Sequence, residues 1–294
     1  MLVEDGFLFG APHTSCSHLV NTETNIWFAI EGPNFFCAHS FKHFTGVGHH
    51  VFTHIQLILL KFGISDDKRK SPKYWSVKQG ALTGVTDGSL KKNRFITWNA
   101  STIRNFELQI KVKFSDRANS GIQYRSKMLP EIGLDVAGGY QCDIMARENM
   151  NGMAYEERGR RILSYTGQKV IVDQKGQPWV IGEMLVKKFP PNVWHQYSIS
   201  IRGNHHQHWI NGHKTADFID LDENGRALDG ILGFQVHVGP AMQIQFKDIR
   251  MKHLPDNLPL RTSADTKIPP SAYGVRPQGT PKNGWTAPFY RDQN

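Results

Sequence analysis

The sequence is poor in cysteine and has no long hydrophobic run. The three cysteines, Cys16, Cys37 and Cys142, have no paired spacing, so neither a disulfide framework nor a zinc knuckle is predicted. The longest apolar run, residues 51–62, is shorter than the about 20 residues that a membrane-spanning helix needs. No basic segment followed by a small-residue cleavage site precedes it, so no signal peptide is visible.

The sequence has fewer acidic than basic residues. Lys and Arg number 35 against 26 Asp and Glu, which gives a formal net charge of +9. A basic chain is typical of nucleic-acid-binding proteins, but the excess is dispersed and its local clusters are confined to residues 68–70 and 158–161. No recognition helix, zinc spacing or aromatic RNA-binding signature accompanies them. We therefore expect a solvated basic surface, or attraction to acidic glycans, and no nucleic-acid partner.

Helical periodicity is weak, whereas strand periodicity is strong in the region 71–254. Residues 106–114 alternate between apolar and polar side chains, the pattern of a half-buried antiparallel strand. Residues 75–82 resemble a hairpin around Lys78-Gln79-Gly80, and Asn211-Gly212 suits a type I′ turn. One short helix is expected within residues 155–172. The pattern predicts an all-β sandwich of two antiparallel sheets.

The two ends of the chain differ from this central domain. Residues 1–70 hold seven of the 14 histidines and lack alternation. They are either an atypical N-terminal extension or the result of a wrongly placed start codon, and we favour the second interpretation. Residues 255–294 contain seven prolines and predict an extended tail, either a strap along the sandwich or a linker.

Polar side chains recur at alternate positions of three expected strands. These positions are Gln123 and Arg125 in the first strand, Gln141 and Asp143 in the second, and Gln235 and His237 in the third. Side chains two apart share a face of a strand, so each strand offers one polar face. A solvated outer face more often carries Lys, Glu, Ser and Thr. The composition therefore favours a cleft for a polar ligand, with plain solvent exposure as the alternative.

An ordered series of motifs resembles the 3-keto-disaccharide hydrolase domain family. The motifs are Trp75-Ser76-Val77, Gly80-Ala81-Leu82-Thr83-Gly84, Asn105-Phe106-Glu107-Leu108, Asn119-Ser120-Gly121-Ile122-Gln123-Tyr124-Arg125, Gly139-Tyr140-Gln141, Trp194-His195, Gly203-Asn204, Asn211-Gly212 and Gly233-Phe234-Gln235. The resemblance covers about residues 72–254. It implies the concanavalin A-like jelly roll, a sandwich with a concave carbohydrate-facing sheet. Family members usually begin with a strand that residues 1–70 lack, so one sheet edge is expected to be exposed or covered by other sequence.

The resemblance also implies an activity. The substrate is a carbohydrate already oxidised at C3, because the C3 ketone acidifies the C2 proton and lets the C1 substituent leave by β-elimination before water adds back. An oxidoreductase that makes the 3-keto sugar is the implied functional partner. The implied location is periplasmic or extracellular.

Elimination needs a base, an electrophile for the enolate oxygen and an acid for the leaving oxygen. On this reading Asp143 or His237 is the base and Arg125 holds the enolate oxygen. The acid is one of Tyr155, Glu156 and Glu157, of which we favour Glu157. The expected substrate-binding residues are Gln123, Gln141, Tyr155, Glu156, Arg160, His208 and Gln235.

The polar block at residues 155–160 has two interpretations. It is either a solvated loop with internal ion pairs or a loop over the polar face that brings Tyr155, Glu157 and Arg160 to the sugar. Retaining glycosidases of this fold carry Glu-x-Asp-x-x-Glu on one strand, whereas this chain has Gln141, Asp143 and Ala146 at those positions. Double displacement by that machinery is therefore not expected.

Cofactor requirements are open. His206 and His208 share a strand face and could bind a divalent metal ion with Asp143 or His237, but their spacing determines no third ligand. No other cofactor is expected. The alternative to an enzyme is a non-catalytic carbohydrate-binding module, with Arg125, Asp143 and a tryptophan as ligand contacts. An interaction domain in a surface complex has only the proline-rich tail to support it.

Overall fold

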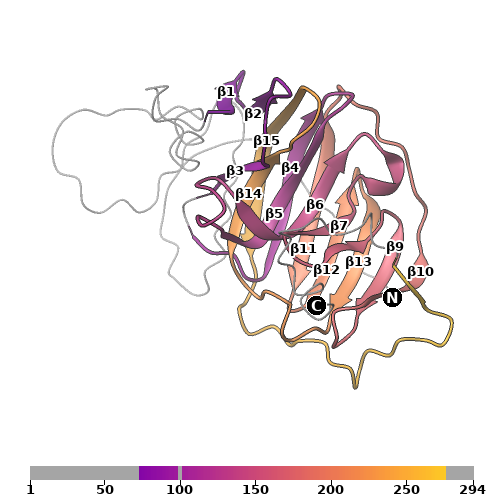
Figure 1. Cartoon of the computed structure of the whole chain (residues 1–294). Coiled ribbons are helices and arrows are strands. Elements are labelled where there is room, and N and C mark those ends of the chain that lie inside the picture. The colour runs from indigo at the N-terminus through magenta and orange to yellow at the C-terminus, as the bar shows by residue number, and fades with distance from the viewer. Residues whose placement is uncertain (1–72, 99–100, 276–294) are drawn as a thin grey trace, which may run out of the picture.

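The computed structural model describes residues 73–98 and 101–275 as two β-sheets packed face to face (Figure 1). A single turn of 3-10 helix, η1 (Glu148–Met150), is the helical element of the described chain. The expected N-terminal extension, residues 1–70, lies outside the described residues, as do tail residues 276–294. The prediction of an all-β sandwich is confirmed.

The larger sheet has ten strands. In sheet order they are β1 (Trp75–Lys78), β2 (Ala81–Thr86), β15 (Met242–His253), β4 (Phe106–Phe114), β11 (His195–Arg202), β12 (His205–Ile210), β13 (His213–Asp220), β9 (Gln168–Val172), β10 (Pro178–Glu183) and β16 (Tyr273–Gly274). Every neighbouring pair is antiparallel except β13 and β9, which run parallel.

The smaller sheet has six strands and is antiparallel throughout. In sheet order they are β3 (Arg94–Thr97), β14 (Ile231–Val236), β5 (Asn119–Met128), β6 (Ala137–Met145), β7 (Ala154–Glu157) and β8 (Arg161–Ser164). Its centre, β5 and β6, carries two of the polar stripes identified in the sequence.

Several local predictions are confirmed. Residues Phe106–Phe114 form β4 with the expected alternation of buried and more exposed side chains. The hairpin of β1 and β2 turns at Gln79 and Gly80, and Asn211 and Gly212 have the positive φ angles, 49° and 77°, of a type I′ turn. That turn joins β12 to β13.

The helix expected within residues 155–172 is wrong. This stretch forms β7, β8 and β9, and β7 and β8 pair with each other as a hairpin. The tight connection between them is made by Arg158 and Arg161, which have positive φ angles of 54° and 71°. A residue in the left-handed region cannot continue a right-handed helix, so the chain turns back into the sheet.

The inner faces of the two sheets form one core. Phe234 of the small sheet stacks on Phe246 of the large sheet with ring centroids 4.3 Å apart. Tyr140 packs against His206 at 4.6 Å, and His206 packs against Phe218 at 4.5 Å. Aromatic rings therefore supply much of the contact between the layers.

The proline-rich tail is a strap as far as residue 275. Asn105 donates through Nδ2 to the backbone oxygen of Pro255 at 2.7 Å, and Asn204 binds both backbone groups of Arg261. The tail then reaches the far side of the large sheet, where β16 pairs with β10 (Figure 1). In the described chain no helix has the length and apolar character to cross a membrane.

Two histidines, His206 and His208, are buried between the sheets, and their hydrogen bonds determine which ring nitrogen carries the proton. His208 directs Nδ1 to the Gly152 carbonyl at 3.2 Å, so Nε2 accepts from the Tyr124 hydroxyl at 2.9 Å. That hydroxyl in turn accepts from His206 Nδ1 at 3.3 Å. Burial lowers the pKa of His206 well below its ordinary value and that of His208 to about 4. Both rings are therefore neutral in the folded protein at pH 7.

This pair makes stability sensitive to acid. A histidine of depressed folded pKa binds its proton first in the unfolded chain, so stability falls as the pH drops below about 6.5, by about 1.4 kcal/mol per pH unit for each histidine. His208→Gln keeps an acceptor for Tyr124 and a donor for Gly152 but does not titrate. We expect urea unfolding at pH 7, 6 and 5 to show a shallower loss of stability for this variant than for the wild type. The surface change His253→Gln should leave the wild-type slope, and equal slopes for all three proteins would contradict the prediction.

Candidate functional site

Polar side chains gather on the outer face of the six-stranded sheet. We call this set the polar face; its members are Gln123, Gln141, Asp143, Tyr155, Glu157 and Gln235. Pairing sets Gln123 opposite Gln141, and Gln141 opposite Tyr155, on adjacent strands. Side chains of directly paired residues share a face of the sheet.

A one-way chain of hydrogen bonds crosses this face. The Ser126 hydroxyl donates to Gln123 Oε1 at 2.5 Å, and Gln123 Nε2 donates to Gln141 Oε1 at 2.6 Å. Gln141 Nε2 then donates to Asp143 Oδ1. Each amide accepts on its oxygen and donates from its nitrogen, so all the donors point toward Asp143. The chain ends on a group that accepts best when it is a carboxylate.

Gly121 leaves the space that Gln141 occupies in this chain of hydrogen bonds. A Cβ at this position would lie 2.3 Å from Cδ of Gln141, far inside van der Waals contact. Gln141 therefore lies across the Gly121 backbone between β5 and β6. The glycine noted in the sequence is a packing requirement of the polar face.

Asp143 is held in a low-polarity environment. Its side chain is almost fully buried, with 4% exposed, and this burial raises its pKa to about 8. The hydrogen bond from Gln141 opposes the rise, and the negative charge of Glu157 adds to it. A carboxylate with a pKa near neutrality is a stronger base than an ordinary aspartate.

Glu157 is the second buried carboxylate of the polar face. It accepts from Asn93 Nδ2 at 3.2 Å and from Gln235 Nε2 at 3.4 Å. Burial raises its pKa, while Arg158 and these two hydrogen bonds oppose the rise. Gln235 Oε1 is buried and has no hydrogen-bond partner among the described residues. Gln235 Oε1 can therefore accept a hydrogen bond from a ligand hydroxyl beside Glu157.

Tyr155 and His237 are the half-buried members of this region. The Tyr155 hydroxyl interacts with Arg161, and burial raises the Tyr155 pKa, so the phenol stays protonated. His237 lies just beyond β14, two residues from Gln235, with Nδ1 2.5 Å from the Val238 carbonyl. That contact makes Nδ1 the donor and leaves Nε2 as the basic nitrogen. Burial lowers the His237 pKa.

Arg125 does not share the face of Gln123, contrary to the alternation argument. A bulge in β5 sets Arg125 and Ser126 opposite the single residue Gly139, and Arg125 has a φ of 46°. The bulge turns the guanidinium inward. There it binds the backbone oxygens of Arg104 and Gly203, both at 2.7 Å, and its pKa falls to about 10 through burial. Arg125 links the two sheets and has no free edge for an enolate.

Glu156 and Arg160 also lie away from the polar face. Glu156 is adjacent to Glu157 in β7, so the two side chains point to opposite sides. Arg160 binds Glu156 Oε2 at 2.7 Å, Asp220 Oδ2 at 2.6 Å and Asp222 Oδ2 at 3.1 Å. This buried ion cluster ties the β7–β8 turn to the end of β13. It supports the fold and leaves no donor of Arg160 for sugar binding.

His206 and His208 share a face, as expected, but that face is the core. Tyr124 and Gly152 engage both ring nitrogens of His208, and Tyr124 engages His206 Nδ1, whereas His206 Nε2 is buried with no hydrogen-bond partner among the described residues. Both rings lie on the other side of the small sheet from Asp143. They therefore do not form a metal site with Asp143 or His237, and His208 does not reach a ligand on the polar face. Within residues 73–98 and 101–275, no three histidine, cysteine or acidic side chains gather in a way that could hold a metal ion.

Sequence reasoning missed three residues of this region. Ser126 joins the polar face only because of the bulge, and Asn93 arrives from a loop before β3. Arg161 reaches Tyr155 through the β7–β8 hairpin. The sequence held one signal for this region. Alternation along a strand from Tyr155 sets Glu157 on the same face as Tyr155 and Glu156 on the opposite face.

The outer face of the six-stranded sheet thus carries buried acidic and amide side chains. A family model described as the 3-keto-alpha-glucoside-1,2-lyase-like domain matches residues 63–252. The chain belongs to this family. No curated protein matches the sequence.

Solved structures show distant likenesses. A proposed glycosyl hydrolase from Parabacteroides distasonis is 19% identical over 63% of this chain and 86% of its own, with a TM-score of 0.42. A carbohydrate-binding module, CBM66 from Bacillus subtilis, is 14% identical over 60% of this chain and 90% of its own, with a TM-score of 0.39. A Bacillus subtilis protein of unknown function with a galectin-like fold is 10% identical over 61% and 86%, with a TM-score of 0.41.

The packing of Gln141 over Gly121 can be tested by adding one methyl group. Gly121→Ala should push Gln141 off Asp143 and destabilise the protein by about 1–3 kcal/mol. The hydrogen bond from Gln141 lowers the Asp143 pKa in the wild type, so the loss of this bond should raise the pKa further. A carboxyl ¹³C NMR titration would measure the change. Gly182→Ala is the matched control, since its Cβ would meet nothing closer than 3.6 Å. If Gly121→Ala matched the control in stability and in Asp143 titration, the assigned packing would be wrong.

The raised pKa of Asp143 also predicts a stability effect. Between about pH 4 and pH 8 the folded protein holds a proton that the unfolded chain has released, so the wild type loses stability as the pH rises. Asp143→Asn removes this penalty. We expect the free energy of unfolding of the variant to rise relative to that of the wild type from pH 4 to pH 8, by roughly a few kcal/mol in total. Denaturant unfolding at both pH values measures this, with the exposed Asp135→Asn as control, and a pH-independent difference would refute it.

Proposed function

We propose that this chain is an enzyme that cleaves 3-keto-glycosides, with Asp143 as the base. The observation that carries the proposal is the buried Asp143 carboxyl, whose pKa is raised to about 8 and which the Gln123–Gln141 chain orients. Family membership supports the substrate class. Periplasmic or extracellular location and an oxidoreductase that supplies the oxidised sugar belong to the same proposal and rest on the family alone.

The chemistry runs in two stages. Asp143 removes the C2 proton, and the C2–H electron pair forms an enolate with the C3 ketone. The enolate then collapses, the C1–O bond breaks, and the leaving oxygen takes a proton from an acid. Water adds at C1 and a proton returns to C2, which gives the 3-keto sugar and the free alcohol. Each positioned acid or base contributes on the order of 10²–10⁴ in rate.

The other roles follow from position and protonation. Glu157 is the acid, because it is the second buried carboxyl of the polar face and lies close enough to Asp143 for the two groups to interact electrostatically. Tyr155, supported by Arg161, donates to the enolate oxygen in place of Arg125. The free Oε1 of Gln235 accepts from a sugar hydroxyl. His237 Nε2 is an alternative base at the rim.

A non-catalytic carbohydrate-binding module is the second candidate. The observation that favours it is the concentration of planar amides, Gln123, Gln141 and Gln235, which suit sugar hydroxyls and need no proton transfer. In this case Asp143 serves as an acceptor for a hydroxyl pair.

Turnover separates the two candidates. The full chain is incubated with 3-keto-trehalose, 3-keto-lactose and their unoxidised parents, with and without added divalent metal, and release of the 3-keto sugar is followed. We expect cleavage of the keto sugars alone, with kcat/KM rising with pH toward about 8 as Asp143 ionises. Asp143→Asn should lower kcat by about 10²–10⁴ with little change in substrate affinity. Binding of both sugar sets without cleavage would instead support the binding module.

A further inference from the structure

The outer face of the ten-stranded sheet is basic, and the proposed function does not use it. Strand pairing sets Lys247 of β15 opposite Lys111 of β4, and Asp217 of β13 opposite Lys169 of β9. Directly paired residues share a face of the sheet, and the other face of these strands is the core. We call this surface the basic face; its cations include Lys111, Lys113, Lys169, Arg202, Lys214 and Lys247.

The carboxylates of the basic face are already paired with some of its cations. The pairs are Glu107 with Arg202, Asp248 with Lys111, and Asp217 with Lys214. They leave Lys113, Lys169 and Lys247 without an ion pair among the described residues. The face therefore carries a net positive charge after its internal pairs are formed.

Trp194 gathers two of these unpaired lysines at one place. The Nζ atoms of Lys247 and Lys113 lie 4.3 Å and 5.1 Å from the centroid of its ring. An ammonium group over an indole ring is attracted by the ring and still has N–H groups to donate. Two positive charges are thus brought together before an anion arrives, which lowers the entropy that binding costs.

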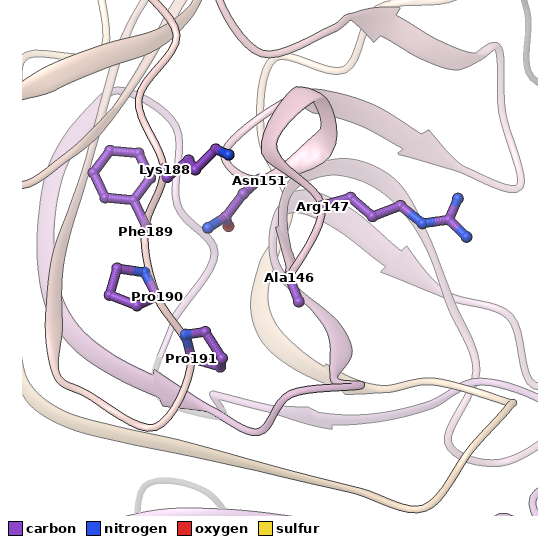
Figure 2. Close-up of a pocket in the computed structure, with 7 residues that line it drawn as sticks. All are labelled: Ala146, Arg147, Asn151, Lys188, Phe189, Pro190 and Pro191. Carbon is purple, nitrogen blue, oxygen red and sulfur yellow. The ribbon is translucent and has the colours of Figure 1, made fainter.

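The backbone that carries Trp194 is anchored. The segment that leads into β11 contains Phe189 and Pro190, and Figure 2 shows it beside the turn that holds Arg147. His195, which directly follows Trp194, has Nε2 2.7 Å from the Pro190 carbonyl, and Phe189 packs edge-on against its ring at 5.7 Å. These contacts hold the start of β11 and so fix the position of Trp194 on the basic face.

The basic face also carries groups that suit sugar hydroxyls. Its central strands β4, β11 and β12 present Gln109, Ser198, Ser200 and Gln207 between the cations. Amide and hydroxyl side chains both donate and accept hydrogen bonds, as sugar hydroxyls do. An acidic glycan could therefore use its charged groups and its hydroxyls on the same surface.

Two other classes of acidic partner fit this surface less well. Single-stranded nucleic acid binds by stacking bases on aromatic rings, but lysine ammonium groups lie over Trp194 and over Trp209, whose centroid is 5.5 Å from Lys214 Nζ. A lipid surface takes up exposed apolar side chains. The exposed large apolar side chains on the described strands of this sheet lie toward its two edges, at Val85, Ile181 and Tyr273.

We propose that the basic face binds an extended acidic polysaccharide. The anionic groups of the polymer pair with Lys113, Lys247 and Lys169, and its hydroxyls bind the amides and hydroxyls between them. The polar face belongs to the other sheet, so a protein held on the polymer in this way keeps the polar face directed away from it. The proposal does not depend on the reaction assigned to the polar face.

Binding is tested on the full chain with polygalacturonate, uncharged dextran, single-stranded oligothymidylate and vesicles of phosphatidylserine with phosphatidylcholine. We expect polygalacturonate to bind with Kd on the order of 10 µM at about 50 mM salt, and to bind severalfold more weakly at about 200 mM, because salt screens surface charges. The other three probes should bind at least about tenfold more weakly. Equal binding of dextran would remove the role of charge, and tighter binding of oligothymidylate or of the vesicles would assign the face to nucleic acid or to lipid. Each of these results would overturn the proposal.

Charge-neutral variants locate the surface. Lys113→Gln together with Lys247→Gln removes both charges at Trp194 and should weaken polygalacturonate by about tenfold. The matched control is Lys91→Gln together with Lys127→Gln, which removes the same charge at exposed positions before β3 and in β5. Equal weakening by both pairs would show an effect of net charge alone, and unchanged affinity in the first pair would exclude the site; either result would overturn the proposal.

Two further comparisons keep the test independent of folding and of turnover. If the variant at Lys113 and Lys247 does not fold, Lys169→Gln against Lys127→Gln gives the same comparison at the other end of the basic face. Asp143→Asn should bind polygalacturonate as the wild type does, whatever its turnover. A loss of polymer binding in that variant would place the polymer on the polar face instead.

Discussion

The bulge at Arg125 and Ser126 is the constraint on which both the sandwich and the polar face depend. One extra residue in β5 reverses the side-chain direction beyond Tyr124. Arg125 then enters the core, where it satisfies backbone oxygens of segments that belong to the opposite sheet. Ser126 takes the outward position and orients Gln123, and through it Gln141 and Asp143. A single backbone irregularity thus fastens the layers and aligns the site.

Gly139 is the reason that the bulge fits. It has a φ of 139° and faces Ser126, whose Oγ would lie 2.5 Å from a Cβ at that position. A side chain on β6 at this point would close the space into which Ser126 turns. The polar face is therefore determined as much by an absent side chain as by the polar residues themselves.

The sequence predicted those features that depend on regular alternation. β4, the β1–β2 hairpin and the Asn211-Gly212 turn follow from local pattern, and so do the outward directions of Gln141, Asp143 and Gln235. It failed where an arginine in the left-handed region interrupts the strand pattern. Arg125, Arg158 and Arg161 all have positive φ, a conformation that no propensity assigns to arginine and that tertiary contacts impose. Asp220, the buried partner of Arg160, and Tyr124, the buried partner of His208, come from the opposite sheet, and no single-strand pattern reports them.

The strap formed by the tail has a consequence for solubility. A large open sheet has exposed edge strands whose unpaired backbone groups can recruit strands of other molecules. Here the tail returns to pair with β10 as β16, which is only two residues long, Tyr273–Gly274. The outermost strand on that side covers Trp179 and Val180 of β10 and offers only two residues of its own to a strand of another molecule.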